Sequence, residues 1–310
     1  MNRENRIGIL AAIVGNGIFG FSFMFSRIAL GIATPFVMLM YRFILAFVLL
    51  ALIALWSAHF RKPVARQGAQ ADWLRFNLKG RRLMPLLLMG IVQPVGYFLC
   101  ESYGISLSNS TFAGVIIATG PLAALVAGAL ALREYPKRSQ VIFSLISIAG
   151  VIIMTLLQRA EGEVRLGGVV LLIGAVTCGT SFAVISRKLS GEFSALERTC
   201  VMMFVAAVSF TVMAVIQCRG SWEMLTAPLH NASFVAAVLY LGVASSVIAF
   251  MALNVASGCL PVAKSMAFCN MTTVISLFAG VIFLHEPFNL VSLFASVLII
   301  LGIWGVQQVR

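Results

Sequence analysis

Three polar side chains interrupt the apolar run MGIVQPVGYFLCESYGI, residues 89–105. Gln93, Tyr97 and Glu101 stand four residues apart, so a helix would align them as one polar stripe. An amide, a phenol and a carboxyl group on one stripe can hydrogen-bond a polar solute, bind a cation or exchange a proton. Pro94 lacks an amide hydrogen, which predicts a bend in the helix beside Gln93. We therefore expect a binding site here, with Glu101 contacting a substrate or a coupling proton.

Glu101 also has two structural interpretations. An acidic side chain deep in a bilayer costs about 2.5–3.5 kcal/mol on insertion scales, so it needs a cation, water or a proton. Arg42 could supply the cation, which would make a salt bridge. Glu101 lies near the end of its run, where a long side chain can also extend toward the membrane surface.

Other apolar runs carry further polar candidates for the same site. Thr119 stands beside Pro121, which interrupts the next run. Ser and Thr hydroxyls often bond their own helix, whereas an Asn amide in mid-membrane needs protein, water or a ligand as a partner. The candidate substrate-binding residues are Asn16, Ser22, Gln93, Tyr97, Glu101, Thr119, Ser181, Asn254 and Asn270.

Helices that cross a bilayer must position these side chains. Hydrophobic residues make up 61% of the 310 residues, charged residues make up 10%, and the mean hydropathy is +1.02. A water-soluble domain could not bury so much apolar surface. A helix needs roughly 20 residues to cross the hydrocarbon, and strands of a closed barrel would alternate instead. The sequence predicts an all-α integral membrane protein with ten spans, at residues 7–30, 34–56, 83–106, 110–132, 138–157, 167–187, 196–217, 232–256, 260–284 and 287–308.

Lys and Arg residues predict the orientation of these spans. With the N-terminus in the cytoplasm, most of the 22 basic residues fall in cytoplasmic segments. We therefore expect both termini in the cytoplasm and a location in a membrane of the bacterial inner-membrane type. Anionic lipid at the inner surface accounts for the net charge of +12, which therefore does not indicate nucleic-acid binding. The basic loop at residues 60–82 contains interleaved apolar residues and predicts a short helix lying on the inner leaflet.

No motif in the chain predicts a metal, a cofactor or catalysis. The six cysteines form no C-x-x-C pair, and the three histidines lie far apart at loop edges. The sequence lacks the G-x-x-x-x-G-K-[ST] phosphate loop and H-E-x-x-H, and it places no Ser, His and Asp set within the spans. We expect no cofactor and no enzymatic activity.

The second half of the chain repeats the first. LREYPKRSQVIFSLISIAG (132–150) aligns with LHEPFNLVSLFASVLIILG (284–302), and the same offset pairs Gly90 with Gly242. Each half holds five spans, an odd number, so the second half must enter the membrane with opposite polarity. We expect two inverted-topology five-helix repeats with an outer connecting loop, at residues 1–157, 158–166 and 167–310.

Glu134 and Glu286 are paired by this alignment, and each precedes an apolar run with a proline nearby. A carboxylate in that position suits the free amides at the start of the helix that follows. We interpret both residues as structural caps of their own helices.

The chain resembles the drug/metabolite transporter superfamily, in particular its EamA-type branch. The resemblance rests on the two five-span repeats, on G-x-S-F in the first span, on Pro35 followed by Tyr41-Arg42-Phe43, and on the Glu and Pro that open spans five and ten. It implies a secondary transporter, commonly an exporter of amino acids or related small metabolites. In that family the first four spans of each half surround a central cavity, and spans five and ten lie at the periphery.

Alternating access to a central site is the function that the repeat and the resemblance lead us to expect. Polar residues and the family architecture predict a cavity lined by spans one, three, four, six, eight and nine. The expected partner is a small organic solute, an amino acid or a cationic metabolite, with proton coupling as an option, and the lipid bilayer surrounds the chain. A passive channel or facilitator for small polar or cationic solutes is the alternative, and an intramembrane enzyme is a weaker one.

Overall fold

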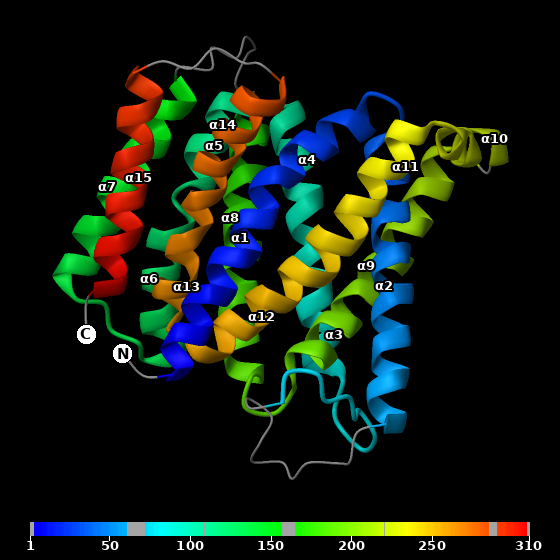
Figure 1. Ribbon diagram of the computed structural model, residues 1–310, viewed down its shortest axis with the longest axis horizontal. Coiled ribbons are helices and arrows are strands. Elements are labelled where there is room, and N and C mark those ends of the chain that lie inside the picture. Colours follow the sequence, from blue (N-terminus) through cyan, green and yellow to red (C-terminus); the bar gives the residue numbers. More distant parts are fainter. Residues whose placement is uncertain are drawn as a thin grey trace.

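The computed structural model describes residues 3–60, 72–107, 110–156, 165–219, 221–284 and 290–308, and within these ranges it contains helices and no strand (Figure 1). Nine helical segments of this described part are long and apolar enough to cross a membrane, and the shorter apolar helix at Arg138–Met154 fills the place of the predicted fifth span. Each of the ten predicted runs therefore coincides with a helical segment. The all-α prediction is confirmed.

Two of the first five spans are interrupted where the sequence has proline. In the third span a π-helical stretch, Ile91–Gly96, contains Pro94, and Gln93 leaves the helical conformation with φ −145° and ψ 125°. The fourth span breaks between Ile117 and Gly120, just before Pro121. The helices of this half are α1 (Arg3–Leu30), α2 (Pro35–Phe60), α3 (Met84–Gly90), α4 (Tyr97–Ser106), α5 (Ser110–Ile117), α6 (Gly120–Leu132) and α7 (Arg138–Leu156).

Interruptions occur at the corresponding places in the second half. The eighth span contains a longer π-helical stretch, Tyr240–Ala249, and the ninth span contains a short 3₁₀ turn, Phe268–Asn270. The helices are α8 (Leu166–Leu189), α9 (Ala195–Gln217), α10 (Trp222–Thr226), α11 (Ala232–Leu239), α12 (Phe250–Cys259), α13 (Val262–Ala267), α14 (Met271–Leu284) and α15 (Leu290–Gln308).

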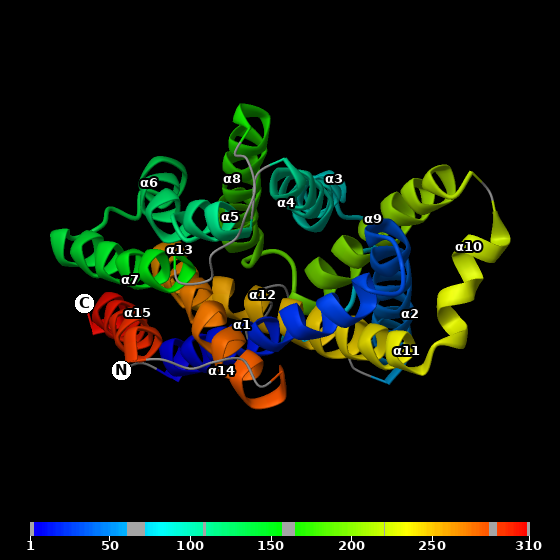
Figure 2. The same ribbon diagram turned by 90° about the horizontal axis from the view of Figure 1, so that it is seen from above.

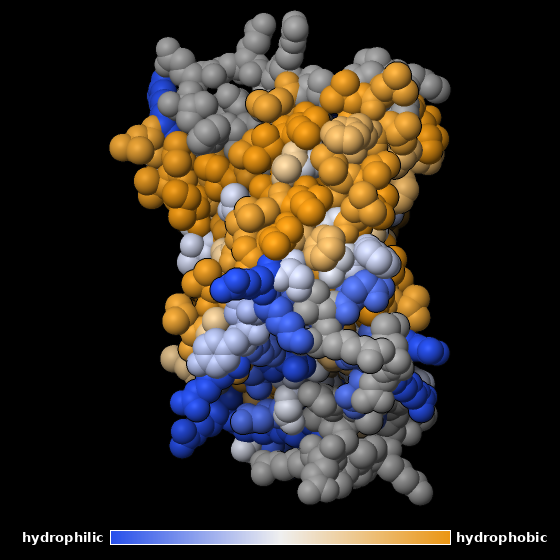
Figure 3. Space-filling view, turned by 90° about the vertical axis from the view of Figure 1, so that its left-hand side faces the viewer, coloured by the Kyte–Doolittle hydropathy of each residue, from blue (hydrophilic) through white to orange (hydrophobic). Residues whose placement is uncertain are grey.

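The spans pack in pairs that join the two halves. Helix α7 lies against α15 at one edge of the molecule, and α2 lies against α9 toward the other (Figures 1 and 2). On the face that carries α7 and α15, apolar residues cover the upper part and hydrophilic residues gather below them (Figure 3). This arrangement agrees with helices five and ten lying at the periphery.

Close glycine contacts are equivalent in the two halves, as a pseudo-two-fold relation between them requires. A methyl group on Gly150 of α7 would lie 2.7 Å from the carbonyl oxygen of Ala295 in α15. A methyl group on Gly302 of α15 would lie 2.6 Å from the carbonyl oxygen of Phe143 in α7. The repeat alignment pairs Gly150 with Gly302 and Phe143 with Ala295, so the two contacts are equivalent.

Gly90 and Gly242, which the repeat alignment also pairs, make a second set of equivalent close contacts. Gly90 of α3 approaches Val205 of α9, where an added methyl group would lie 2.9 Å from the valine Cβ. Gly242 approaches Leu45 of α2, where the corresponding distance to the leucine Cδ2 is 2.6 Å. Each third span of a half therefore packs on the second span of the other half, as inverted repeats require.

The symmetry is broken between the two sides of the membrane. We call the side on which both chain ends lie the terminal side (Figure 1). On that side α6 packs against α13 and α8 packs against α12. In the repeat alignment, the pair α6–α13 corresponds to α14–α5, and the pair α8–α12 corresponds to α1–α4. The described residues of these two corresponding pairs make far less contact with each other. The α6–α13 and α8–α12 contacts are thus present on the terminal side, whereas their symmetry counterparts, α5–α14 and α1–α4, are weak among the described residues.

The loop between the second and third spans differs from its prediction. Residues 72–82 contain turns and no helix, and they pack across the start of α9, where the amide of Leu196 donates to the carbonyl oxygen of Trp73 at 3.0 Å. The prediction of a short helix on the inner leaflet is wrong for this part of the loop, because its polar groups bond to protein. Residues 61–71 lie outside the described part of the chain.

Candidate functional site

The predicted polar residues extend from the break in the third span into α4, on the side away from the chain ends (Figure 1). Tyr97 and Glu101 are one turn apart in α4, and the Tyr97 hydroxyl donates to Glu101 Oε1 at 3.0 Å. Gln93 lies in the non-helical position, and its buried side-chain oxygen accepts no hydrogen bond from the described residues. Glu101 and Tyr97 are both half-buried.

Helix α8 faces the stripe through a glycine. A methyl group on Gly179 would lie 3.6 Å from the Tyr97 ring and 3.8 Å from Gln93 Oε1. Ser181 comes two residues later, so it points to the other side of α8. Its hydroxyl is partly exposed and does not reach the stripe directly.

Arg42 of α2 lies next to the stripe, although it does not form the hypothesised ion pair. Its guanidinium donates from Nε to Ser246 Oγ at 2.8 Å and from Nη2 to Ser245 Oγ at 2.7 Å. Its Cζ lies 5.2 Å from the centre of the Phe98 ring, next to Tyr97 in the sequence. Among the described residues, Arg42 and Glu101 make no contact within ion-pair distance, and each bonds to neutral hydroxyl groups instead. The two serines, brought together by the π-helical stretch, take the place of the carboxylate.

Asn254 belongs to a separate, fully buried network. Its Oδ1 accepts from Ser186 Oγ at 2.7 Å, and its Nδ2 donates to Thr199 Oγ1 at 2.9 Å. Arg198 donates to the backbone oxygens of Ser186 and Asn254, both at 2.7 Å. The network joins α8, α9 and α12 on the terminal side, away from the stripe.

The other predicted residues have local or peripheral partners. Asn16 and Ser22 are buried in α1 and donate to the carbonyl oxygens of Ala12 at 2.8 Å and Ile18 at 2.9 Å. Thr119 donates to Ile116 at the break in the fourth span, at 2.6 Å. Asn270 is buried and donates to Ser147 Oγ of α7 at 3.0 Å. The structure therefore brings together Gln93, Tyr97 and Glu101, and it places these four residues in helix-stabilising contacts.

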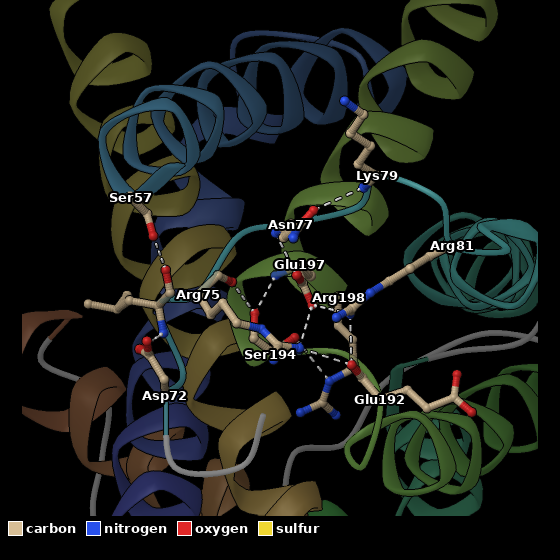
Figure 4. Close-up of polar contacts among 11 residues, drawn as sticks. Ser57, Asp72, Arg75, Asn77, Lys79, Arg81, Glu192, Ser194, Glu197 and Arg198 are labelled. Atoms are coloured by element: carbon tan, nitrogen blue, oxygen red, sulfur yellow. Dashed lines mark hydrogen bonds and ion pairs between the residues drawn. The ribbon is translucent and has the colours of Figure 1, made fainter. Parts of the chain in front are cut away.

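A buried acidic residue on the terminal side was missed at the level of sequence. Glu197, in the first turn of α9, has no exposed surface. Its carboxylate accepts hydrogen bonds from the backbone amides of Asn77 at 2.7 Å and Ser194 at 2.8 Å. Arg81 Nη1 lies 3.3 Å and Arg75 Nη2 lies 3.8 Å from Glu197 Oε2 (Figure 4). The pattern Ser194-x-x-Glu197 before an apolar run is a capping-box signature that could have identified this residue.

Glu134 caps a different helix from the one predicted. Its Oε2 accepts from the amide of Val262, which opens α13, at 2.9 Å, and its Oε1 lies 3.3 Å from Arg187 Nε. Arg187 in turn donates to the carbonyl oxygen of Gly258 at 2.5 Å. Glu134 therefore links the ends of several spans instead of capping α7, and Glu286 lies outside the described residues.

Nothing in the described chain gathers metal-binding side chains. No group of three or more His, Cys, Asp and Glu residues there is placed to hold an ion. The polar groups near the stripe are instead suited to hydrogen bonding and to charge complementarity with an organic solute.

Comparison with known proteins relates the whole chain to membrane transporters. Residues 6–156 and 166–307 each match the model of the EamA-like transporter family. An uncharacterized transporter, YcxC, from Bacillus subtilis (strain 168) is 27% identical over 96% of this chain and 91% of that protein. An uncharacterized transporter from Archaeoglobus fulgidus is 21% identical over 76% of this chain and 81% of its own length. A crystal structure with 17% identity superposes with a TM-score of 0.75 over 97% of this chain and 95% of the other, which shows a shared fold.

Proposed function

Because the chain belongs to the EamA-like transporter family, we propose that it is a secondary active transporter that exports amino acids or related small organic metabolites by alternating access. It would do so as a non-enzymatic, multi-pass protein of a bacterial-type inner membrane, with both termini in the cytoplasm. The two halves at residues 1–157 and 167–310 would be its moving units, and the boundaries of the two family matches support this division.

The proposal of an amino acid as substrate rests on two side chains of opposite charge, Arg42 and Glu101, which lie at the stripe without forming an ion pair with each other. Arg42 is held by two neutral serines and Glu101 by a neutral tyrosine, so neither charge is neutralised by contact with the other. A zwitterionic amino acid carries the complementary pair, an ammonium for Glu101 and a carboxylate for Arg42. Burial makes such complementary contacts stronger than they would be in water. Gln93, with an unused side-chain oxygen, would supply a further hydrogen bond.

The packing of the two halves supports alternating access. The inverted repeat provides a second, nearly equivalent arrangement in which the contacts of the terminal side would form on the opposite side. If the termini lie in the cytoplasm, the arrangement in this structure would close the central site to the cytoplasm and open it to the outside. A proton on Glu101 would be a simple coupling ion, because binding of an ammonium group and binding of a proton compete for the same carboxylate.

Counterflow in proteoliposomes tests this proposal against a channel. Vesicles loaded with an unlabelled amino acid should accumulate labelled amino acid transiently, and the initial rate should saturate with concentration. A thermal-shift screen against amino acids, polyamines and quaternary ammonium compounds would select the solute, because ligands that bind the folded state stabilise it. Unsaturable flux without counterflow would favour the passive channel, and chemical conversion of the solute would favour an enzyme.

A further inference from the structure

A cavity lies away from the stripe, at the terminal side of the bundle. It has a volume of about 630 Å³, which is within the range of small-molecule sites, roughly 300–1,000 Å³. Residues from α1, α6, α7, α13 and α15 and from the segment before α7 line it. Lys137, Gln140 and Lys264 supply its polar wall, and Ile9, Ala124 and Leu260 supply apolar wall.

Two lysines, Lys137 and Lys264, line this cavity. Lys264 Nζ donates to the carbonyl oxygen of Gln307 at 3.0 Å, which leaves further donor hydrogens. The Lys137 ammonium has no partner among the described residues, and it borders the same cavity as Lys264. Glu134 is the one acidic residue in the described lining, and both of its oxygens are engaged, by Arg187 and by the Val262 amide.

We propose that this cavity binds the phosphate group of an anionic ligand between Lys137 and Lys264. Two like charges held close together are unfavourable until an anion bridges them, and a phosphate offers several acceptor oxygens. The apolar wall fits the hydrocarbon part of the same molecule. Basic pockets between membrane helices on the cytoplasmic side are suited to anionic phospholipid head groups.

The position of the cavity agrees with a lipid as the source of the phosphate. Figure 3 shows the face that carries α7 and α15, where hydrophilic residues lie directly below the apolar band. Phospholipid phosphates lie at that depth, whereas a soluble phosphate ester would reach the cavity from the aqueous side. The two sources share one chemistry and are separated by experiment.

Thermal unfolding of the delipidated protein in detergent tests the site. Phosphatidylglycerol should raise the Tm of the wild type more than phosphatidylcholine does. Lys137→Gln should weaken the apparent affinity for phosphatidylglycerol about fivefold, and Lys137→Gln with Lys264→Gln should weaken it further. Because the Lys137 ammonium has no partner in the described part of the chain, its variant should retain the unliganded Tm.

Lys188→Gln is the matched control, because Lys188 is an exposed lysine at the end of α8 outside this lining. It should keep the full response to phosphatidylglycerol. Titration with glycerol 3-phosphate distinguishes the source: a response that depends on Lys137 identifies a soluble phosphate ester, and no response identifies the lipid. If both lysine variants responded to both probes as the wild type does, the proposal would be overturned.

Discussion

Glu101 carries the central prediction at the scale of single residues. Glu101→Gln keeps the shape of the side chain and an acceptor for the Tyr97 hydroxyl, but it removes the negative charge. We expect the affinity for a substrate with an ammonium group to fall about tenfold or more, because one charge-assisted contact is lost. Counterflow at varied substrate concentration measures this, with Glu223→Gln on the exposed surface of α10 as the control. Unchanged affinity with unchanged pH dependence would make Glu101 a structural residue.

The sequence predicts residues of the site that depend on local periodicity and misses those that depend on tertiary contacts. Spacing alone places Gln93, Tyr97 and Glu101 on one face of a helix. In the structure Tyr97 and Glu101 share a helix and a hydrogen bond, whereas Gln93 lies in the non-helical break and approaches Gly179 together with Tyr97. The partner of Arg42 could not be predicted in the same way. A π-helical stretch brings two consecutive serines against the guanidinium, and single-sequence patterns carry no signal for that change of helix type.

The element that connects the second and third spans is expected to stabilise the terminal side. Glu197→Ala would remove the acceptor shared by two backbone amides and Arg81, so the donors would remain buried without partners. We expect the free energy of unfolding to fall by about 3 kcal/mol. Glu192→Ala is the control, because its carboxylate is exposed and points away from the network, while only its carbonyl oxygen accepts from Arg75 and Arg81 (Figure 4). Equal stability of the two variants in a denaturant titration would contradict this role.

The contact between α7 and α15 gives a second prediction at the scale of elements. Gly302→Ala would place a methyl group 2.6 Å from a backbone oxygen of α7, so the two helices must separate. We expect a loss of about 1–3 kcal/mol in the free energy of unfolding, as for overpacked cores. Gly17→Ala makes the same change in the middle of α1, where the nearest atom would lie at 3.7 Å. The control should be neutral or slightly stabilising, because alanine favours a helix over glycine. If Gly302→Ala were equally stable, the close approach would not limit the packing.

Helix positions could be predicted from the sequence much better than loops. Hydrophobic length decides where a span lies, and proline decides where the third and fourth spans break, so these features are local. The packing of residues 72–82 on the start of α9, and the hydrogen bond from the Val262 amide to Glu134, depend instead on contacts between residues far apart in the sequence. In both cases, a polar group bonds to a helix end that is distant in sequence, and only the assembled bundle shows which end is nearby.

At the scale of the whole molecule, transport by exchange of the two halves requires the terminal side to open. Gly128 of α6 and Val262 of α13 face each other there, and a Cβ on Gly128 would lie 3.8 Å from the valine Cβ. That separation suits a disulfide. We expect Gly128→Cys with Val262→Cys to crosslink under an oxidant and to lose counterflow at least tenfold, with recovery after reduction.

Two comparisons make the crosslinking result decisive. The chain has free cysteines of its own, so each single-cysteine variant must keep its flux under the same oxidant. Binding of the solute in a thermal-shift assay should survive the crosslink, because the stripe includes neither Gly128 nor Val262 and the proposed outward-open arrangement leaves it accessible from the opposite side. The disulfide would then abolish transport while leaving binding of the solute intact. Complete crosslinking with undiminished counterflow would show that α6 and α13 stay together throughout the cycle, and the halves could not exchange conformations by opening this contact.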